Sequence, residues 1–314
     1  VANFTALAAA RHAVLERSDW NVEADGLFGA PPVTVVVSEE SHPTLFKSLG
    51  MLGFGRSRVV KVAVDRQGRM RADALPPISG PTIICTQAGN VNTGSFDPIG
   101  DICDIAHRSG AWVHVDGAFG LWASASPVLC HLTEGAEKAD SWATDGHKWL
   151  NVPYDSGIAL VCDPHPLKAA MAITAEYLPT SAPHRNPSDF TPELSRRARG
   201  IEVWAALRHL GRGGVADMIE RCCRHARRFA DGFNSSGYRV LNNVVLNQVL
   251  VSFGNPEKTK KVIAGIQQDG TCYCGGTVWQ GQEAIRISVS SWATTEEDVE
   301  KSLTAMLRIA DNIE

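Results

Sequence analysis

The residue with the clearest chemical potential is Lys148, in the segment DSWATDGHKW at Asp140–Trp149. It directly follows His147 and comes soon after the strand-like run Ser141–Thr144, an unusual position for a surface lysine. The surroundings are made apolar by Trp149, Leu150 and Val152. In an apolar pocket the pKa of a lysine falls, and the free amine can attack a carbonyl to form an imine. Taken alone, His-Lys is also compatible with an ordinary lysine in a helix or turn.

A carboxylate forms the second feature. Asp116 ends the apolar run Trp112–Asp116 and is followed by Gly117-Ala118-Phe119-Gly120. An aspartate in this position can simply cap the next turn. It can also keep the nitrogen of a bound heteroaromatic ring protonated, which makes the ring an electron sink. Ala118 is small enough for a flat ring to lie against it.

Two further polar features follow predicted strands. His42 comes after the strand Val33–Val37; alone it is a surface histidine at a helix start, but an imidazole can also stack on a flat ring. The polar, glycine-rich turn Gly89–Gly94, which contains Asn90, follows the strand Thr82–Thr86. Sites in α/β folds lie at the carboxyl ends of strands, where both features fall.

Short β-branched runs alternate with longer amphipathic segments as far as Cys162. Continuous apolar strands alternating with helices predict a largely parallel sheet covered on both faces. The expected strands are Val33–Val37, Val59–Val64, Thr82–Thr86, Trp112–Asp116, Ser141–Thr144 and Gly157–Cys162, and the expected helices include Val1–Leu15, Pro43–Leu52 and Ile99–Ser109.

The rest of the chain predicts a second α/β unit. A long amphipathic helix begins near Glu202 and is interrupted near Gly211–Gly214. The elements expected after it are strands Tyr238–Leu241 and Val249–Phe253, helix Glu257–Gln267, strands around Thr277 and at Ile285–Val289, and helix Thr295–Ile313. A length of 314 residues also favours one large unit and a smaller one, so we expect domains at 1–213 and 214–314.

Composition limits the class of partner. The net charge is −4 and 44% of residues are hydrophobic, so nothing favours nucleic acid or an anionic membrane. No apolar run reaches the roughly 18 residues that a membrane span needs. The eight cysteines are scattered and no signal peptide is visible, which predicts reduced thiols and a cytoplasmic protein. Cys272 and Cys274 lack a second ligand pair with suitable spacing, so we expect no metal site.

Together these motifs resemble the group II pyridoxal-5′-phosphate (PLP)-dependent decarboxylases, the family of glutamate, aromatic-amino-acid and histidine decarboxylases. The resemblance covers nearly the whole chain and is most specific in HVDGAFG (His114–Gly120) and DSWATDGHKWLNVP (Asp140–Pro153). LSRRARGIEVWAALRHLG (Leu194–Gly211) matches a further family stretch. The resemblance implies the aspartate-aminotransferase fold (fold type I), with a mostly parallel sheet of the seven-stranded type and a small C-terminal α/β domain. It also implies PLP and a homodimer.

The resemblance also implies roles for individual residues. Lys148 is expected to form a Schiff base with PLP, and Asp116 to pair with the pyridinium nitrogen. Ala118 and His42 are expected to sandwich the ring. The further cofactor-binding predictions are His147, toward the phosphate, and Asn90; the weaker substrate predictions are Arg199 and Arg286.

The sequence departs from the family pattern at several points. Gly89-Asn90-Val91 stands where Gly-Thr-Thr is common, and Asp145-Gly146 stands where Asn-Pro often precedes His-Lys. The family's loop tyrosine has no clear counterpart, since Phe190 is the only aromatic residue between Tyr177 and Trp204. The helix Val1–Leu15 matches the one that follows the family's phosphate-binding turn, so we expect that turn upstream.

The implied activity is release of CO₂ from an L-amino acid, with Lys148 and His42 as catalytic residues. An aminotransferase or another carbon–carbon lyase is the main alternative, because the pocket decides which bond is broken. A non-catalytic homologue acting as a binding subunit is a minor alternative, and retention of Lys148, Asp116 and His42 disfavours it. The proline-rich loop Pro179–Glu193 is either a plain surface connection or a mobile active-site flap.

Overall fold

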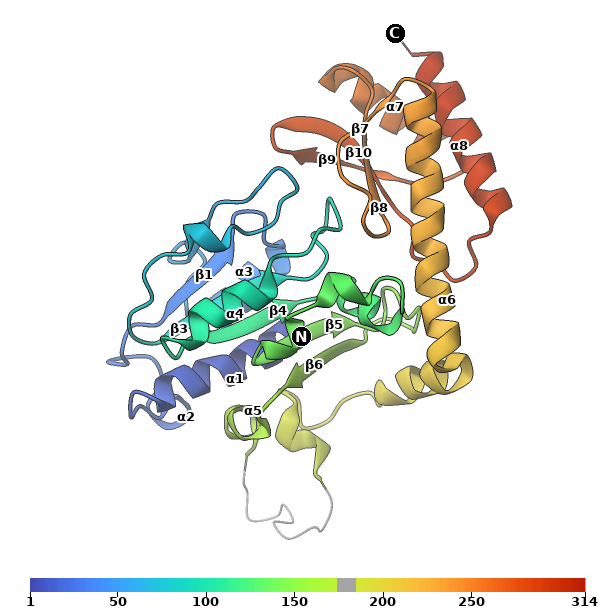
Figure 1. The fold of residues 1–314 in the computed structure, drawn as a ribbon. Helices are drawn as coiled ribbons and strands as arrows, with labels where there is room; N and C mark the ends of the chain where they lie inside the picture. Colours follow the sequence, from blue (N-terminus) through green and yellow to red (C-terminus); the bar gives the residue numbers. More distant parts are fainter. Residues whose placement is uncertain (174–184, 314) are drawn as a thin grey trace.

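The computed structural model describes residues 1–173 and 185–313, which form two sheets flanked by helices (Figure 1). Among the described residues the larger sheet has six strands in the order β2-β1-β3-β4-β5-β6, and it is mostly parallel, as expected. Its strands are β1 (Thr34–Ser38), β2 (Val60–Val62), β3 (Thr82–Gln87), β4 (Trp112–Asp116), β5 (Ser141–Asp145) and β6 (Gly157–Val161). All neighbours pair in parallel except β5 and β6.

Helices cover both faces of this sheet, because its strands are apolar on both sides. Val35 and Val37 of β1 face a cluster with α1 (Ala2–Glu16) and α3 (Pro43–Met51), whereas Val36 faces the opposite cluster with α4 (Ile99–His107). Successive residues of a strand point to opposite faces, so one short strand contributes to both cores. The small helix α2 (Val22–Asp25) and α5 (Pro164–Met171) lie on the α1 side.

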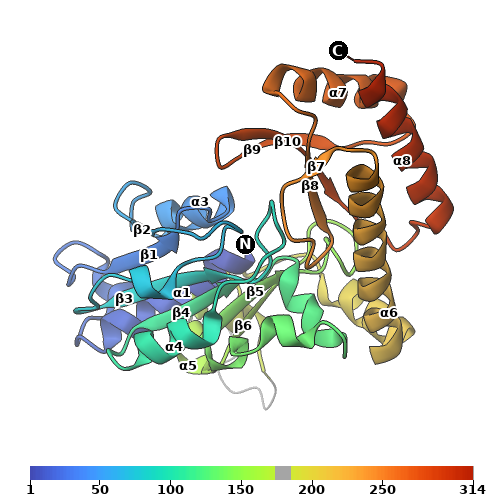
Figure 2. The same cartoon turned by 45° about the horizontal axis from the view of Figure 1, so that its top comes forward.

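The second sheet is antiparallel, with the order β7-β8-β10-β9. It consists of β7 (Arg239–Val240), β8 (Gln248–Ser252), β9 (Gly275–Trp279) and β10 (Gln282–Ser288), covered by α7 (Pro256–Asp269) and α8 (Glu296–Asp311). The long helix α6 (Gly200–Ser235) runs from the large sheet to this one (Figure 2). Its backbone is non-helical at Gly211, where the sequence predicted an interruption, and we propose to keep the domain boundary at 213/214.

The sequence predicted most of these elements with small errors at their ends, but it did not predict α2 and α5. β10, expected over Ile285–Val289, spans Gln282–Ser288, and β2, expected over Val59–Val64, spans Val60–Val62. β2 is an edge strand with Val60 and Lys61 exposed, and short edge strands are a usual protection against unwanted pairing. All eight cysteines are free, and no helix among the described residues is long and apolar enough to cross a membrane. The predicted flap 179–193 overlaps residues 174–184, which lie outside the described residues.

Candidate active site

A cavity of about 400 Å³ lies where the strands of the large sheet end. Gln87 ends β3, Asp116 ends β4 and Asp145 ends β5, and all three line the cavity. This is the edge at which parallel α/β sheets bind their ligands. The other lining residues are Val1, Ala2, Asn3, His42, Thr44, Ser48, Gly89, Val91, Ala118, Phe119, Ala143, His147, Lys148, Tyr154, Gln248 and Arg286.

Lys148 reaches this cavity from the loop between β5 and β6. Backbone N–H groups of Gly146 and His147 both donate to Ser156 O, at 2.9 and 3.2 Å, which closes the loop. The Lys148 Nζ is 3.0 Å from Asp145 Oδ2 and 5.4 Å from the centre of the Phe119 ring. The following residue, Trp149, is fully buried, but the Lys148 side chain itself keeps 29% of its surface exposed, more than the apolar sequence context predicted.

Asp116 is a buried carboxylate at the end of the neighbouring strand β4. Burial raises its pKa, and a hydrogen bond from Asn3 and the positive charge of Lys148 oppose that rise. Asn3 Nδ2 donates to Asp116 Oδ2 at 3.0 Å from the first turn of α1. Two parts of the chain far apart in sequence therefore meet at this carboxylate.

A chain of buried hydrogen bonds continues behind Asn3. His114 Nε2 lies 3.0 Å from Asn3 Oδ1, which can only accept, so Nε2 carries the proton and donates. Burial lowers the pKa of His114 to about 3, so the ring is neutral and its Nδ1 accepts from Ser141 Oγ at 2.9 Å. Ser141 Oγ in turn accepts from Trp112 Nε1 at 2.8 Å. In each of these hydrogen bonds the acceptor is the partner nearer to Asp116 along this chain of bonds, which we call the Asp116 relay.

His42 is the N-cap of α3 and lines the same cavity as Ala118 and Asp116. Its Nδ1 accepts from the Thr44 backbone N–H at 3.3 Å and from Thr44 Oγ at 2.8 Å. The histidine is therefore itself the helix cap, and its neutral ring carries the proton on Nε2. Burial is the main cause that lowers the pKa of His42, with Lys148 and Arg286 adding to the effect and Asp116 opposing it.

The remaining predicted residues at the cavity are His147, Ala118 and Arg286. The His147 ring lies 4.4 Å from the Tyr154 ring, centre to centre, and its Nδ1 lies 2.7 Å from Ser156 O and 3.0 Å from Ser156 N. Arg286 of β10 donates to Val91 O at 3.0 Å, and burial lowers its pKa. The second sheet thus contributes a guanidinium group to a site built mainly by the first.

Asn90 is the predicted cofactor-binding residue that the structure does not place among the residues lining the cavity. Its Oδ1 accepts from the backbone N–H groups of Asn92 and Thr93 at 2.8 and 3.2 Å, and its Nδ2 donates to Glu40 and to Gly68 O at 3.2 and 3.4 Å. The side chain is fully engaged in holding the turn, so the turn's neighbours Gly89 and Val91 face the cavity instead.

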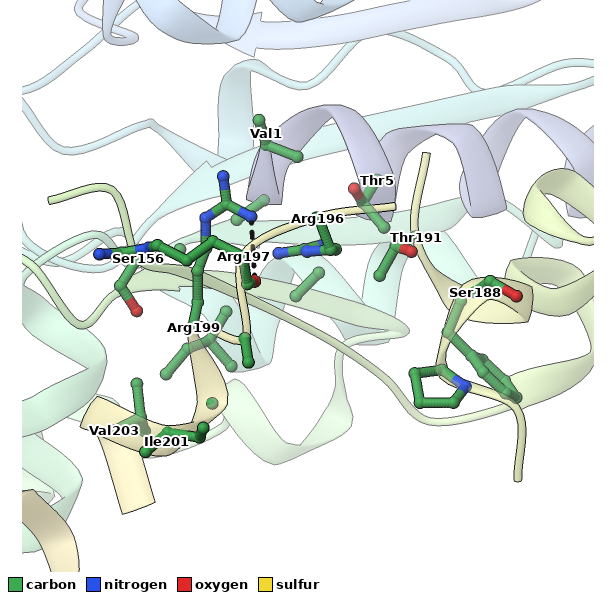
Figure 3. A pocket seen from close by; sticks show the side chains of 18 of the residues that line it. Val1, Thr5, Ser156, Ser188, Thr191, Arg196, Arg197, Arg199, Ile201 and Val203 are labelled. Atoms are coloured by element: carbon green, nitrogen blue, oxygen red, sulfur yellow. Dashed lines mark hydrogen bonds between the residues drawn. The ribbon is translucent and has the colours of Figure 1, made fainter. Parts of the chain in front are cut away.

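Arg199 also lies elsewhere, in a second cavity of about 1120 Å³ that Val1 and Ala2 share with the first (Figure 3). Its Nε and Nη2 donate to the two Asp155 carboxylate oxygens at 2.9 and 3.1 Å. This bidentate pair occupies the guanidinium and holds the pKa of Asp155 down to about 2. The smaller cavity is the candidate active site, because it contains both the Lys148 amine and the buried Asp116 carboxylate.

Sequence reasoning missed Asn3, Gln87, Gln248 and Tyr154, which all line the smaller cavity. Gln87 Nε2 and Gln248 Oε1 are buried without a hydrogen-bond partner among the described residues, so both are free to meet a ligand. Gln87 pairs with Asp116 across neighbouring strands, a contact that the strand pattern alone could have suggested.

The fold and the cavity define an α/β protein with a lysine and a buried aspartate facing one ligand-sized space. Comparison with known proteins gives the family. Residues 1–254 match the model of the pyridoxal-dependent decarboxylase conserved domain, so the chain belongs to that family and PLP is its cofactor, as the sequence motifs predicted.

The relatives that resemble this chain are named after different amino-acid substrates. Tryptophan decarboxylase 1 of Oryza sativa subsp. japonica is 27% identical over 93% of this chain and 62% of that protein. Aspartate 1-decarboxylase of Aliivibrio fischeri is 31% identical over 74% of this chain and 45% of that protein. The chain therefore spans roughly half to two thirds of the length of these relatives.

Solved structures share the fold. The Oryza sativa TDC structure with PLP and tryptamine has a TM-score of 0.89 and 24% identity, covering 99% of this chain and 68% of that one. The mouse CSAD structure has a TM-score of 0.90 and 22% identity, covering 99% and 70%. These likenesses confirm fold type I with a mostly parallel central sheet.

The residues present fit PLP. A cavity of about 400 Å³ is within the size range of small-ligand sites, roughly 300–1,000 Å³. Asp116 offers a buried carboxylate whose Oδ2 is fixed by Asn3, and Lys148 offers an amine in the same space. Ala118 leaves room for a flat ring, and the unpartnered amide of Gln87 lies beside Asp116.

Proposed function

We propose that this protein is a decarboxylase of L-amino acids that holds PLP covalently at Lys148. The observation that carries the proposal is the joint placement of Lys148, Asp116, Ala118 and His42 around one cavity. When bound, the cofactor supplies a carbonyl that condenses with amines and a ring that accepts electrons from the bond being broken.

Two carboxylates prepare the site for that chemistry. Asp145 lies 3.0 Å from the Lys148 Nζ and holds the amine at the cavity wall, where its carboxylate can accept the proton that the ammonium group loses on becoming neutral. Asp116 is placed to pair with the ring nitrogen and keep it protonated, and the relay from Asn3 supports its ionised form against the effect of burial.

His42 is the proposed stacking residue and proton donor. When the ring is protonated, Nδ1–H can donate to Thr44 Oγ, and Nε2–H can deliver a proton to the carbon that loses CO₂, which returns the ring to its neutral form. A decarboxylase without a loop tyrosine needs such a donor. Tyr154 also lines the cavity, next to the His147 ring, and its hydroxyl is the second candidate proton donor to test.

Arg286 is proposed to meet a substrate carboxylate, because it is a half-buried cation at the cavity. If that group is a side-chain carboxylate, an acidic substrate follows; if it is the α-carboxylate, Arg286 would retain it and favour transamination. The relatives' names include both aromatic and acidic substrates, so the panel below contains both classes. We further propose a cytoplasmic homodimer, which sedimentation of the purified protein would test by showing a dimer rather than a monomer.

The experiment incubates PLP-loaded protein with aromatic, acidic and diamino L-amino acids and measures CO₂ and amine products. We expect CO₂ from at least one aromatic or acidic substrate. Lys148→Ala should abolish turnover and the absorbance of the covalently held cofactor while leaving the fold intact. Keto acids formed with stoichiometric amino transfer and no CO₂ would replace the decarboxylase proposal by the aminotransferase alternative. Ligand binding with no product of either kind would favour the binding subunit.

A further inference from the structure

A cluster of ligating side chains lies at the opposite end of α1 from the cavity. His12 and Glu16 of α1 meet His165 of α5, and one ligand atom from each lies within 4.8 Å of the others. His12 is nine residues beyond Asn3 on the helix, about 14 Å along its axis at 1.5 Å per residue. We propose that His12, Glu16 and His165 form a binding site for a divalent metal ion of the zinc type.

The spacing of the three side chains suits such an ion. His12 Nε2 is 3.5 Å from Glu16 Oε1, and Glu16 Oε2 is 3.9 Å from His165 Nδ1. Zinc binds nitrogen and oxygen at about 2.0–2.2 Å, which sets neighbouring ligands of a tetrahedron about 3.3–3.6 Å apart. The ligand atoms lie within 4.8 Å of one another, so the cluster would contract by up to about 1.5 Å around the ion, and a water would complete four-coordination.

The burial of His12 is the second observation. Its side chain is only 9% exposed, yet its Nε2 is buried without a hydrogen-bond partner among the described residues. Nδ1 lies 2.5 Å from Glu23 Oε2, and a carboxylate only accepts, so the Nδ1 proton is committed to Glu23. A neutral ring would then point a lone pair at a Glu16 oxygen 3.5 Å away, which is unfavourable unless a cation lies between them.

Glu23 bonds the ring nitrogen of His12 that would not bind the metal ion. Histidines that bind zinc usually donate their other ring N–H to a carboxylate, which fixes the tautomer and makes the ring a stronger ligand. Arg11 also reaches Glu23, with Nη2 3.5 Å from Oε1. The ligands come from α1 and α5 and the supporting carboxylate from α2, so a bound ion would join three helices on one face of the sheet.

The competing occupant of the space is a proton, which would make His12 doubly protonated. A metal-free sample, separated from unbound cofactor, is titrated with Zn²⁺ against a chromophoric chelator and with Co²⁺ in the visible range. We expect one high-affinity site, a Co²⁺ spectrum without thiolate charge-transfer bands, and a thermal midpoint that rises with Zn²⁺ concentration.

Substitutions of His165 and Glu16 should not disturb the fold, because 64% and 52% of their side-chain surfaces are exposed. His165→Gln and Glu16→Gln should each weaken Zn²⁺ binding at least about tenfold, and Glu23→Gln by about 10–100-fold. His209→Gln, an exposed histidine on α6, should bind as the parent does. The proposal would be overturned if the parent has no high-affinity site, or if Co²⁺ gives thiolate bands. It would also be overturned if His165→Gln and Glu16→Gln bind Zn²⁺ as tightly as the parent.

Discussion

The relay behind Asp116 makes Asn3 the most informative residue to change. Asn3 accepts from His114 and donates to Asp116, each at 3.0 Å, and both partners are buried. Asn3→Ala removes the donor to Asp116 and leaves the His114 Nε2–H without its acceptor. The expected result is a higher pKa for Asp116 and weaker binding of PLP, because a protonated Asp116 cannot pair with a protonated ring nitrogen.

The size of the effect follows from the bonds that are lost. A hydrogen bond to a charged group contributes about 1.5–3 kcal/mol, and one pKa unit corresponds to about 1.4 kcal/mol. The pKa of Asp116 should therefore rise by about 1–2 units in Asn3→Ala. The N–H of His114 stays buried without an acceptor, so Asn3→Ala should also lower the free energy of unfolding by about 1–3 kcal/mol.

The assay is the pH dependence of PLP affinity, measured by equilibrium binding. In the parent, affinity should fall on acidification as Asp116 becomes protonated, and in Asn3→Ala the fall should begin at higher pH. Asn3→Asp is the matched control: it can still accept from His114 but cannot donate to Asp116 and adds a like charge, so it should shift the profile further. Superimposable profiles for the parent and Asn3→Ala would refute the relay.

Three other changes test the remaining parts of the site. Asp116→Asn should retain some cofactor but lower kcat by about 10²-fold or more, the loss typical of one preorganised electrostatic partner, and similar kcat values would remove Asp116 from the mechanism. His42→Phe keeps an aromatic face without a donor, so product formation should slow by about 10²-fold or more while PLP affinity changes little; an unchanged rate would transfer the donor role elsewhere. Burial lowers the pKa of His114 from 6.5 to about 3, so its contribution to stability is complete above pH 6.5 and is lost as pH falls toward 3, at about 1.4 kcal/mol per unit. Denaturant unfolding of cofactor-free protein should show this acid slope, and His114→Gln should flatten it; an identical slope would contradict the assignment.

Local sequence patterns were sufficient for the elements and for the residues inside contiguous motifs. HVDGAFG places Asp116 at a strand end and Ala118 two residues later, and both line the cavity. Gly120 in the same motif permits the turn after β4 to lie on the turn after β3, since a Cβ there would be 2.2 Å from Ala88 O. Features like these depend on neighbours in sequence, which a pattern can express.

The parts that the sequence did not predict depend on long-range contacts. Asn3 is separated from Asp116 by 113 positions, and its helix pattern gives no sign of that partner. Arg199 pairs with Asp155, 44 positions away in the sequence. It therefore lines the larger cavity and not the smaller one, where the other predicted substrate residue, Arg286, lies. For Asn90 the ambiguity is local: an asparagine in a glycine-rich turn can face a ligand or bond its own backbone, and in this structure its Oδ1 bonds the backbone.

The helix α1 shows why apolar periodicity is a poor guide to the function of a core helix. Most of its residues are buried, so their pattern is set by packing, and the exceptions are the informative positions. At its first turn the buried polar contact is satisfied by Asp116, because Asn3 meets the end of β4. Nine residues later the buried His12 forms a hydrogen bond through only one of its ring nitrogens, with Glu23, and its second nitrogen faces the Glu16 carboxylate. A buried polar atom persists when something compensates its desolvation. At Asn3 that compensation is visible within the protein, and at His12 it requires either a proton or an ion, which is why the two ends of one helix call for different experiments.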